Sequence, residues 1–307
     1  MKCNQKVLII LASFFTQTVV AETPPIPSSK TSINPTAGPI IAAAQPTDSG
    51  LSAVSQAGIP TGVPARKTFK DKLGISYYGV YSGPSLGFQN DYNPTYDGKE
   101  GDVQNLDSLI TASYKITSKF QAGVAFPVLY IPYGDSETIL NNVFVRVSRS
   151  ELVKSARFKM SLASRFYLPT NQDSRDAGFK TGIRVEQNST YDLKRLPITL
   201  GLYTYERQYY YDSKAPSRSI LTLYAAPYVN YQFTSKVGAT LWVDLIQLKQ
   251  PQGKSVSKME NAPVGVQPGV NWDVNDKVSL NPYINLYPGY LSVDSSSLGL
   301  IISAKVL

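Results

Sequence analysis

YKITSKF, from Tyr114 to Phe120, is a phrase that the chain repeats. It returns as YQFTSKV at Tyr231–Val237 and as WDVNDKV at Trp272–Val278. Each copy has an aromatic residue, a polar residue, an apolar residue, a short polar pair, a lysine and a second apolar residue. Weaker copies fill the gap, so the closing apolar residue recurs at intervals of 38, 38, 41 and 41, at Phe120, Phe158, Leu196, Val237 and Val278. Such a period predicts one supersecondary unit repeated along the chain.

Apolar and polar residues alternate on both sides of each copy. After the first copy, Phe120, Val124 and Phe126 share one parity, whereas Gln121 and Gly123 fall on the other. A period of two indicates strands whose two faces meet different environments. Twelve strands are expected, at residues 73–81, 106–116, 120–130, 139–148, 158–165, 179–186, 198–203, 221–233, 237–245, 264–274, 278–286 and 298–306. Each repeated phrase is then a tight turn within a hairpin, and longer polar connections lie on the opposite side.

The first residues are typical of a secretory signal. Lys2 and Lys6 precede a short apolar run, and small residues that end at Ala21 suit cleavage. The run is too short to span a membrane as a helix, so residues 1–21 are expected to be a cleavable signal peptide. Cys3 leaves with that signal, and the exported chain then has no cysteine and no disulfide.

The exported chain is expected to have two unequal parts. Residues 22–66 are rich in proline, serine and alanine and carry little bulky apolar mass, which predicts a disordered periplasmic segment, either a tether or a plug. Residues 67–307 carry the alternation and predict a single barrel domain. The formal charge of +8 falls to +6 without the two signal lysines, and no basic block is present, so nucleic acid is not an expected partner.

The length of the alternating runs distinguishes a membrane barrel from a soluble sandwich. Several runs exceed ten residues, whereas ordinary strands have about five or six. The polar parity is rich in small residues and tyrosine and poor in lysine and glutamate for a water-exposed exterior. Tilted strands of about 9–11 residues span a bilayer, and closure removes the edges that lipid cannot hydrate. The expected fold is therefore all-β: a transmembrane antiparallel up-and-down barrel of twelve strands, with the apolar face toward lipid.

The hairpin phrase, the alternation and the last strand, SLGLIISAKVL, resemble bacterial Gram-negative outer-membrane β-barrel proteins of the porin or channel kind. The resemblance covers about residues 67–307 and is architectural, so it indicates no single family. It implies an outer-membrane location, outer-membrane lipid as solvent, and barrel-assembly machinery and periplasmic chaperones as partners in biogenesis. Monomer and homo-oligomer both remain open. Barrels of this class usually end on an aromatic residue in phase with the lipid face, whereas this chain ends at Leu307, one residue past Val306.

The residue inventory disfavours an enzyme. The exported chain lacks histidine and cysteine, so the usual base near neutral pH and the usual transition-metal ligands are missing. Asp107 and Asp244 are expected to face the interior and could act as carboxylate catalysts, but inward acids in a narrow barrel are more often structural charges. No catalytic residue, cofactor or metal site is predicted.

The inward-facing charges indicate the function. Basic side chains gather on the polar parity of neighbouring strands, at Arg146, Lys159, Arg165, Lys180, Arg184 and Arg207. The acids Asp107 and Asp244 come from other strands, so a basic wall would lie across the pore from them and favour anions. A twelve-stranded barrel is wide enough for a narrow channel. The sequence therefore predicts a passive channel for small hydrophilic solutes that favours anions.

Two other interpretations stay open. The charges, together with Glu186, could form a ladder that holds a small lumen closed, and the protein would then be a structural or adhesive barrel with working surface loops. The connection at residues 82–104 is the longest candidate for such a loop. Alternatively, residues 22–66 could thread the pore as in a translocator, although they are short and featureless for a passenger.

Overall fold

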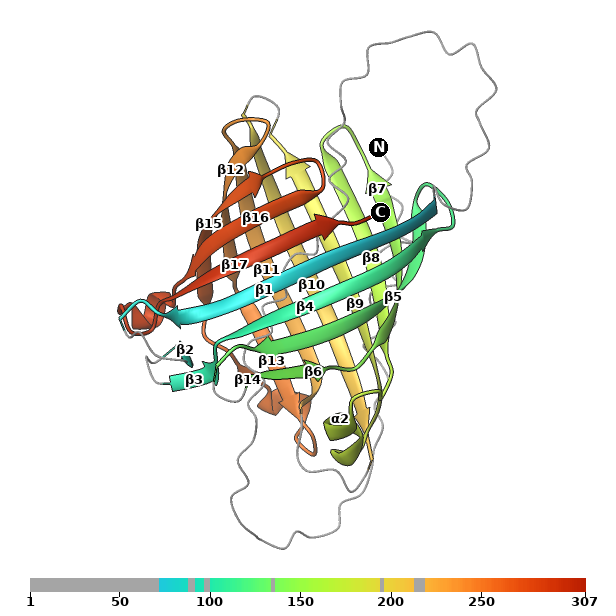
Figure 1. Ribbon diagram of the computed structural model, residues 1–307, viewed down its shortest axis with the longest axis vertical. Coiled ribbons are helices and arrows are strands. Elements are labelled where there is room, and N and C mark those ends of the chain that lie inside the picture. Colours follow the sequence, from blue (N-terminus) through green and yellow to red (C-terminus); the bar gives the residue numbers. More distant parts are fainter. Residues whose placement is uncertain (1–71, 88–91, 97–99, 134–135, 194–195, 213–218) are drawn as a thin grey trace, which may run out of the picture. The chain divides into compact units, whose positions relative to one another are not determined.

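The computed structural model describes residues 72–87, 92–96, 100–133, 136–193, 196–212 and 219–307. The expected signal peptide at residues 1–21 and the expected disordered segment at residues 22–66 lie outside this part of the chain. Within it, the structure is almost entirely β (Figure 1).

Within the described residues, twelve long strands close into one antiparallel barrel, as predicted. They are β1 (Leu73–Ser85), β4 (Asn105–Lys115), β5 (Phe120–Ile131), β7 (Phe144–Lys154), β8 (Phe158–Tyr167), β9 (Phe179–Asp192), β10 (Ile198–Tyr211), β11 (Ser219–Gln232), β12 (Val237–Asp244), β15 (Gly265–Asp273), β16 (Val278–Asn285) and β17 (Ser297–Lys305). Consecutive strands pair in an up-and-down order, and the first strand pairs with the last, β1 with β17. Closure leaves no free edge among these strands, which is the condition for a sheet in lipid.

The short turns show why the phrase recurs. Thr117, which opens the turn of the first copy, accepts hydrogen bonds through Oγ1 from the backbone N–H groups of Lys119 at 3.2 Å and Phe120 at 3.0 Å. Three other turns repeat this arrangement, with the acceptor side chains of Ser155, Thr234 and Asn275. Serine, threonine and asparagine side chains stabilise turns in this way. The repeat is therefore the signature of one side-chain-locked hairpin turn.

One of the expected strands is divided and another is extended. The strand expected at residues 139–148 splits into β6 (Glu137–Leu140), which pairs with the far half of β5, and β7, which begins only at Phe144. The break lies opposite Pro127, whose carbonyl accepts from Asn141 N at 2.9 Å but which has no N–H to continue the ladder. The strand expected at residues 237–245 continues past Leu245 as β13 (Ile246–Pro251), which still pairs with β11.

Short elements cap the end of the barrel opposite the short turns. They are β2 (Tyr92–Pro94), β3 (Glu100–Val103), α2 (Gln172–Asp176), the 3-10 turn η3 (Val256–Lys258), β14 (Glu260–Asn261) and the 3-10 turn η4 (Pro288–Tyr290). No helix in the described part of the chain has the length and apolar character needed to cross a membrane.

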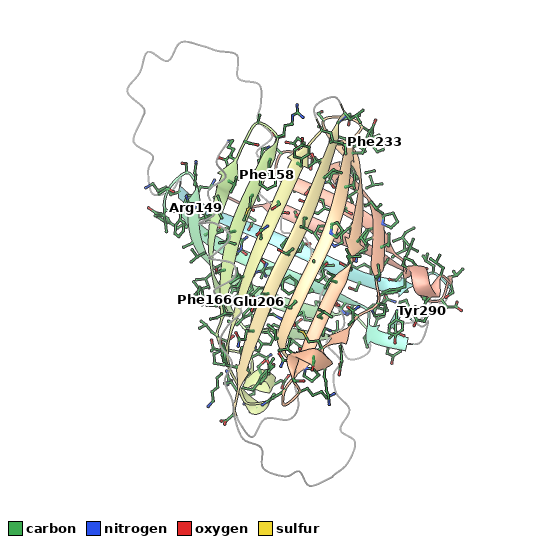
Figure 2. All side chains as sticks on the ribbon, turned by 180° about the vertical axis from the view of Figure 1, so that it is seen from behind. Arg149, Phe158, Phe166, Glu206, Phe233 and Tyr290 are labelled. Carbon is green, nitrogen blue, oxygen red and sulfur yellow. The ribbon has the colours of Figure 1, made fainter. Side chains whose placement is uncertain are left out.

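The two parities of the strands separate as the alternation predicts. Large apolar side chains project outward and are exposed, among them Ile110, Val124, Phe126, Leu200, Leu202, Leu241, Val270 and Trp272. Figure 2 shows Phe158 and Phe233 on the outside near the short-turn end, and Phe166 and Glu206 farther along the strands. Polar and aromatic side chains fill the inside, where Tyr203, Tyr224 and Trp242 are buried. The barrel is thus apolar outside and polar inside, the reverse of a soluble sandwich.

Candidate functional site

Four arginines lie side by side on the inner wall. The strand registers pair Arg146 of β7 with Arg165 of β8, Arg165 with Arg184 of β9, and Arg184 with Arg207 of β10. Side chains directly opposite each other on neighbouring antiparallel strands have Cβ atoms about 4.5–5.5 Å apart. These residues, called the arginine row below, therefore form one transverse line of positive charge across four strands. Like charges in such positions repel each other.

One carboxylate serves as the shared counterion of the arginine row. Glu186 lies two residues after Arg184 on β9 and so faces the same side of the sheet. Its Oε2 accepts from Arg165 Nη2 at 2.8 Å and lies 3.2 Å from Arg184 Nε, while its Oε1 accepts from Arg146 Nε at 3.4 Å. Tyr203 OH also donates to Oε2, at 2.9 Å. Charge-assisted bonds to several donors stabilise a carboxylate that is only 4 % exposed.

Aromatic rings supply the remaining contacts of the guanidinium groups. The Arg184 guanidinium lies 3.8 Å from the ring centroid of Tyr205, and Arg184 Nη2 donates to Tyr203 OH. The Arg165 guanidinium lies 5.0 Å from the ring centroid of Phe144. Rings attract cations through their negative faces, more strongly when the pair is desolvated. The inner wall thus stabilises the positive charge of the row without neutralising it.

Arg207 differs from the other three members. Its Nη2 donates to Thr222 Oγ1 at 3.3 Å and its guanidinium lies 4.8 Å from the ring centroid of Tyr209. Among the described residues no carboxylate lies within ion-pair distance of Arg207. Its Nε is buried and finds no hydrogen-bond acceptor in the described part of the chain. Arg207 is therefore the least compensated end of the row.

A second polar cluster surrounds Asp244 on β12. Its Oδ1 accepts from Trp242 Nε1 at 3.0 Å and from Tyr224 OH, and its Oδ2 accepts from Gln267 Nε2 at 3.0 Å. Trp242 stacks on the ring of Tyr228 with 5.0 Å between ring centroids and 9° between planes. The side chain of Asp244 thus accepts hydrogen bonds from three neutral donors, Trp242, Tyr224 and Gln267.

Asp107 on β4 also lies on the inner face, half-buried, opposite Val80 of β1 and Leu129 of β5. The two inward acids thus come from strands other than the four that carry the arginine row. Within the described residues no group of three histidine, cysteine, aspartate or glutamate side chains could hold a metal ion.

The two predicted lumen lysines lie at the ends of the barrel. Lys159 has the inward parity but sits one residue from the start of β8, where its Nζ lies 3.5 Å from Asp192 Oδ2 and its side chain is 52 % exposed. Lys180, which was predicted to line the lumen, does not join the arginine row. A register shift between β9 and β10 pairs Tyr211 with Phe179 rather than with Lys180, so Phe179 turns inward and is 6 % exposed. Lys180 instead lies 3.6 Å from Asp212 with a 63 % exposed side chain.

The sequence interpretation also missed the aromatic lining of the lumen. Tyr205 stacks on Tyr224 at 4.8 Å, and the ring of Tyr228 lies over Gly201, where an added Cβ would come within 2.0 Å of Cζ. A signal is present in the sequence, because Tyr205 has the parity of the inward Arg207 on the same strand.

Comparison with known proteins supports the architecture. No protein-family model matches this sequence, and no curated protein matches it. Among solved structures, an outer membrane channel from Pseudomonas putida F1 is similar over 76 % of this chain and 94 % of its own, with 12 % identity and a TM-score of 0.50.

Two further solved structures are less similar. The NanC porin matches 76 % of this chain and all of its own with 10 % identity and a TM-score of 0.44. LpxR from Salmonella typhimurium matches 76 % of this chain and 99 % of its own with 7 % identity and a TM-score of 0.38. The likeness to the Pseudomonas putida channel shows a common fold alone, that of an outer-membrane β-barrel.

Proposed function

We propose that this chain forms an outer-membrane channel through which small hydrophilic solutes diffuse passively, with a preference for anions. The observation that carries the proposal is the arginine row, in which four guanidinium groups stand in register and a single carboxylate, Glu186, contacts three of them. The uncompensated charge lies inside a low-dielectric wall, where a ring of like charge attracts counterions and repels co-ions. The proposal includes export by a cleavable signal and insertion by the barrel-assembly machinery.

The channel proposal is tested by the reversal potential of the purified barrel in planar bilayers across a KCl gradient. We expect a preference for chloride over potassium, and each of Arg146→Gln and Arg184→Gln should lower the permeability ratio roughly two-fold because each removes a guanidinium from the lumen. Lys180→Gln is the matched control, since it removes one positive charge from a side chain that the register shift places outside the row. Equal ratios in all four proteins would contradict the anion preference.

A second candidate is a structural or adhesive barrel with a closed lumen and working loops. The observation that favours it is the extent of interior packing, because inward rings cover glycines on neighbouring strands, Tyr209 over Gly182 and Tyr283 over Gly299. Absence of any conductance step from a correctly folded barrel would favour this candidate over the channel.

If the apolar face of the barrel contacts lipid, brominated lipid should quench the fluorescence of one tryptophan and not of the other. Trp272 projects outward beside a short turn and is 48 % exposed, whereas Trp242 is buried in the lumen and 8 % exposed. In vesicles of brominated lipid we expect strong quenching of emission from the Trp242→Phe variant, which retains Trp272, because aromatic residues at the ends of strands contact the lipid interface. The Trp272→Phe variant should be quenched little. Equal quenching of the two variants would contradict the assignment of inside and outside.

A further inference from the structure

The arginine row carries more positive charge than its own acid balances. Glu186 reaches Arg146, Arg165 and Arg184, and among the described residues no carboxylate reaches Arg207. The line of positive charge continues beyond Arg207, because Thr222 of β11 pairs with Lys249 of β13. Glu260 is opposite Lys249 on β14, but its Oε1 lies 3.5 Å from Lys254 Nζ. The excess of charge is therefore greatest on the Arg184–Arg207 side of the row.

The contacts of Glu186 show how the arginine row binds a carboxylate. Its two oxygens are shared among guanidinium groups from three strands, and Tyr203 OH adds a neutral donor. Guanidinium groups present a planar fork of donors that matches the two oxygens of a carboxylate. One strand farther along the row, Arg184 and Arg207 also lie opposite each other on neighbouring strands. Among the described residues, no carboxylate lies within ion-pair distance of Arg207.

One buried donor at this second position has no partner. The Nε atom of Arg207 is buried and has no hydrogen-bond acceptor among the described residues, whereas Arg184 Nε lies 3.2 Å from Glu186 Oε2. Buried side-chain donors are nearly always satisfied in folded proteins, so the unpaired Nε of Arg207 requires an explanation. The rings of Tyr205 and Tyr209 lie against the two guanidinium groups and limit how far these can move.

We propose that Arg184 and Arg207 form a saturable binding position for the carboxylate group of a small organic acid inside the barrel. Binding itself can be measured on the folded barrel without any ion current. Only the predicted effect on transport rests on the proposed channel function. In a conducting barrel, a bound carboxylate neutralises part of the row and occupies the pore. Organic acids should therefore reduce the chloride current at concentrations that saturate the position.

The binding test uses lactate and its neutral amide, lactamide, which differ in the charged group and little in shape. A ligand that binds only the folded state raises the unfolding temperature with concentration. We expect lactate to raise the unfolding temperature of the detergent-solubilised barrel at constant ionic strength, and lactamide to leave it unchanged. Inorganic phosphate is the third ligand. A larger stabilisation by phosphate than by lactate would overturn the assignment to carboxylates.

Three variants test whether lactate binds at Arg207. Arg207→Gln removes the charge, and Arg207→Lys keeps the charge but loses the planar fork, so both should weaken lactate binding about ten-fold or more. Lys180→Gln should bind lactate like the unmodified protein. Unchanged binding by Arg207→Lys would show that lactate merely screens charge, and the binding position would be withdrawn. Lactate stabilisation that is equal in all variants would overturn it as well.

The two proposals fail separately. In one outcome, the barrel conducts anions, gains no stability from lactate, and loses chloride current only linearly with lactate concentration. This result would support the channel and refute the binding position. A barrel that conducts nothing but is stabilised by lactate through Arg207 refutes the channel and confirms the binding position.

Discussion

Replacing Glu186 with glutamine is expected to destabilise the folded barrel by about 3–5 kcal/mol, the typical cost of removing one partner from a buried ion pair. The substitution keeps the shape of the side chain but removes the one carboxylate that contacts Arg146, Arg165 and Arg184 among the described residues. Three neighbouring guanidinium groups would then repel each other without compensation. Urea unfolding in detergent, followed by tryptophan emission, measures the loss.

The same substitution should raise the preference for anions, because the row gains one net positive charge. Stability and selectivity therefore move in opposite directions, which a general folding defect would not produce. Glu206→Gln is the matched control, since Glu206 lies on the outside of β10 and is exposed (Figure 2). Unchanged stability and selectivity in Glu186→Gln would show that Glu186 is not the counterion of the row.

The second prediction with a large expected effect is that the chain folds in detergent or lipid but not in buffer alone. Residues 22–307 are expected to remain unfolded or aggregated in buffer and to fold when detergent micelles or lipid vesicles are added. The reason is the outward face, where side chains such as Leu200, Leu202 and Leu241 are each about 40 % exposed or more. Transfer of such a side chain from water to an apolar medium is favourable by about 1.5–3 kcal/mol.

Far-ultraviolet circular dichroism and the change of electrophoretic mobility on heating report this folding. Strand signal and a heat-sensitive mobility should be present with detergent and absent without it. A monomer that folds cooperatively in plain buffer would mean that the outward face does not contact lipid, and the channel proposal would be abandoned.

Much of the barrel follows from short-range features of the sequence. Thr117, Thr234 and Asn275 mark turns whose hydrogen bonds close within four residues, so their positions can be read without knowledge of the remaining chain. The parity of Leu200 or Val270 is equally local, because side chains alternate along any regular strand. The number of strands and the apolar exterior were predicted for this reason and are confirmed.

The site was harder to predict because it depends on register between strands. Arg184 and Arg207 pair in the β9–β10 hairpin with no register shift between them and the turn. This pair could therefore be predicted from the sequence of the hairpin. The pair of Arg146 and Arg165 was not, because a shift between Arg149 and Val153 changes the register of that hairpin. The pairing of Arg165 with Arg184 spans the longer connection that contains α2, whose length does not determine register.

The sequence by itself determined the twelve alternating strands, the turns that join them and the side of the sheet on which most charges lie. Only the tertiary structure decided that four of these charges stand in one line, that Glu186 is shared among three of them, and that Lys180 is turned away from the row. The physical reason is that alternation and turn hydrogen bonds act over a few residues. Register, by contrast, is set by bulges and by pairing between strands, and one inserted residue reverses the face of every side chain on one side of the bulge.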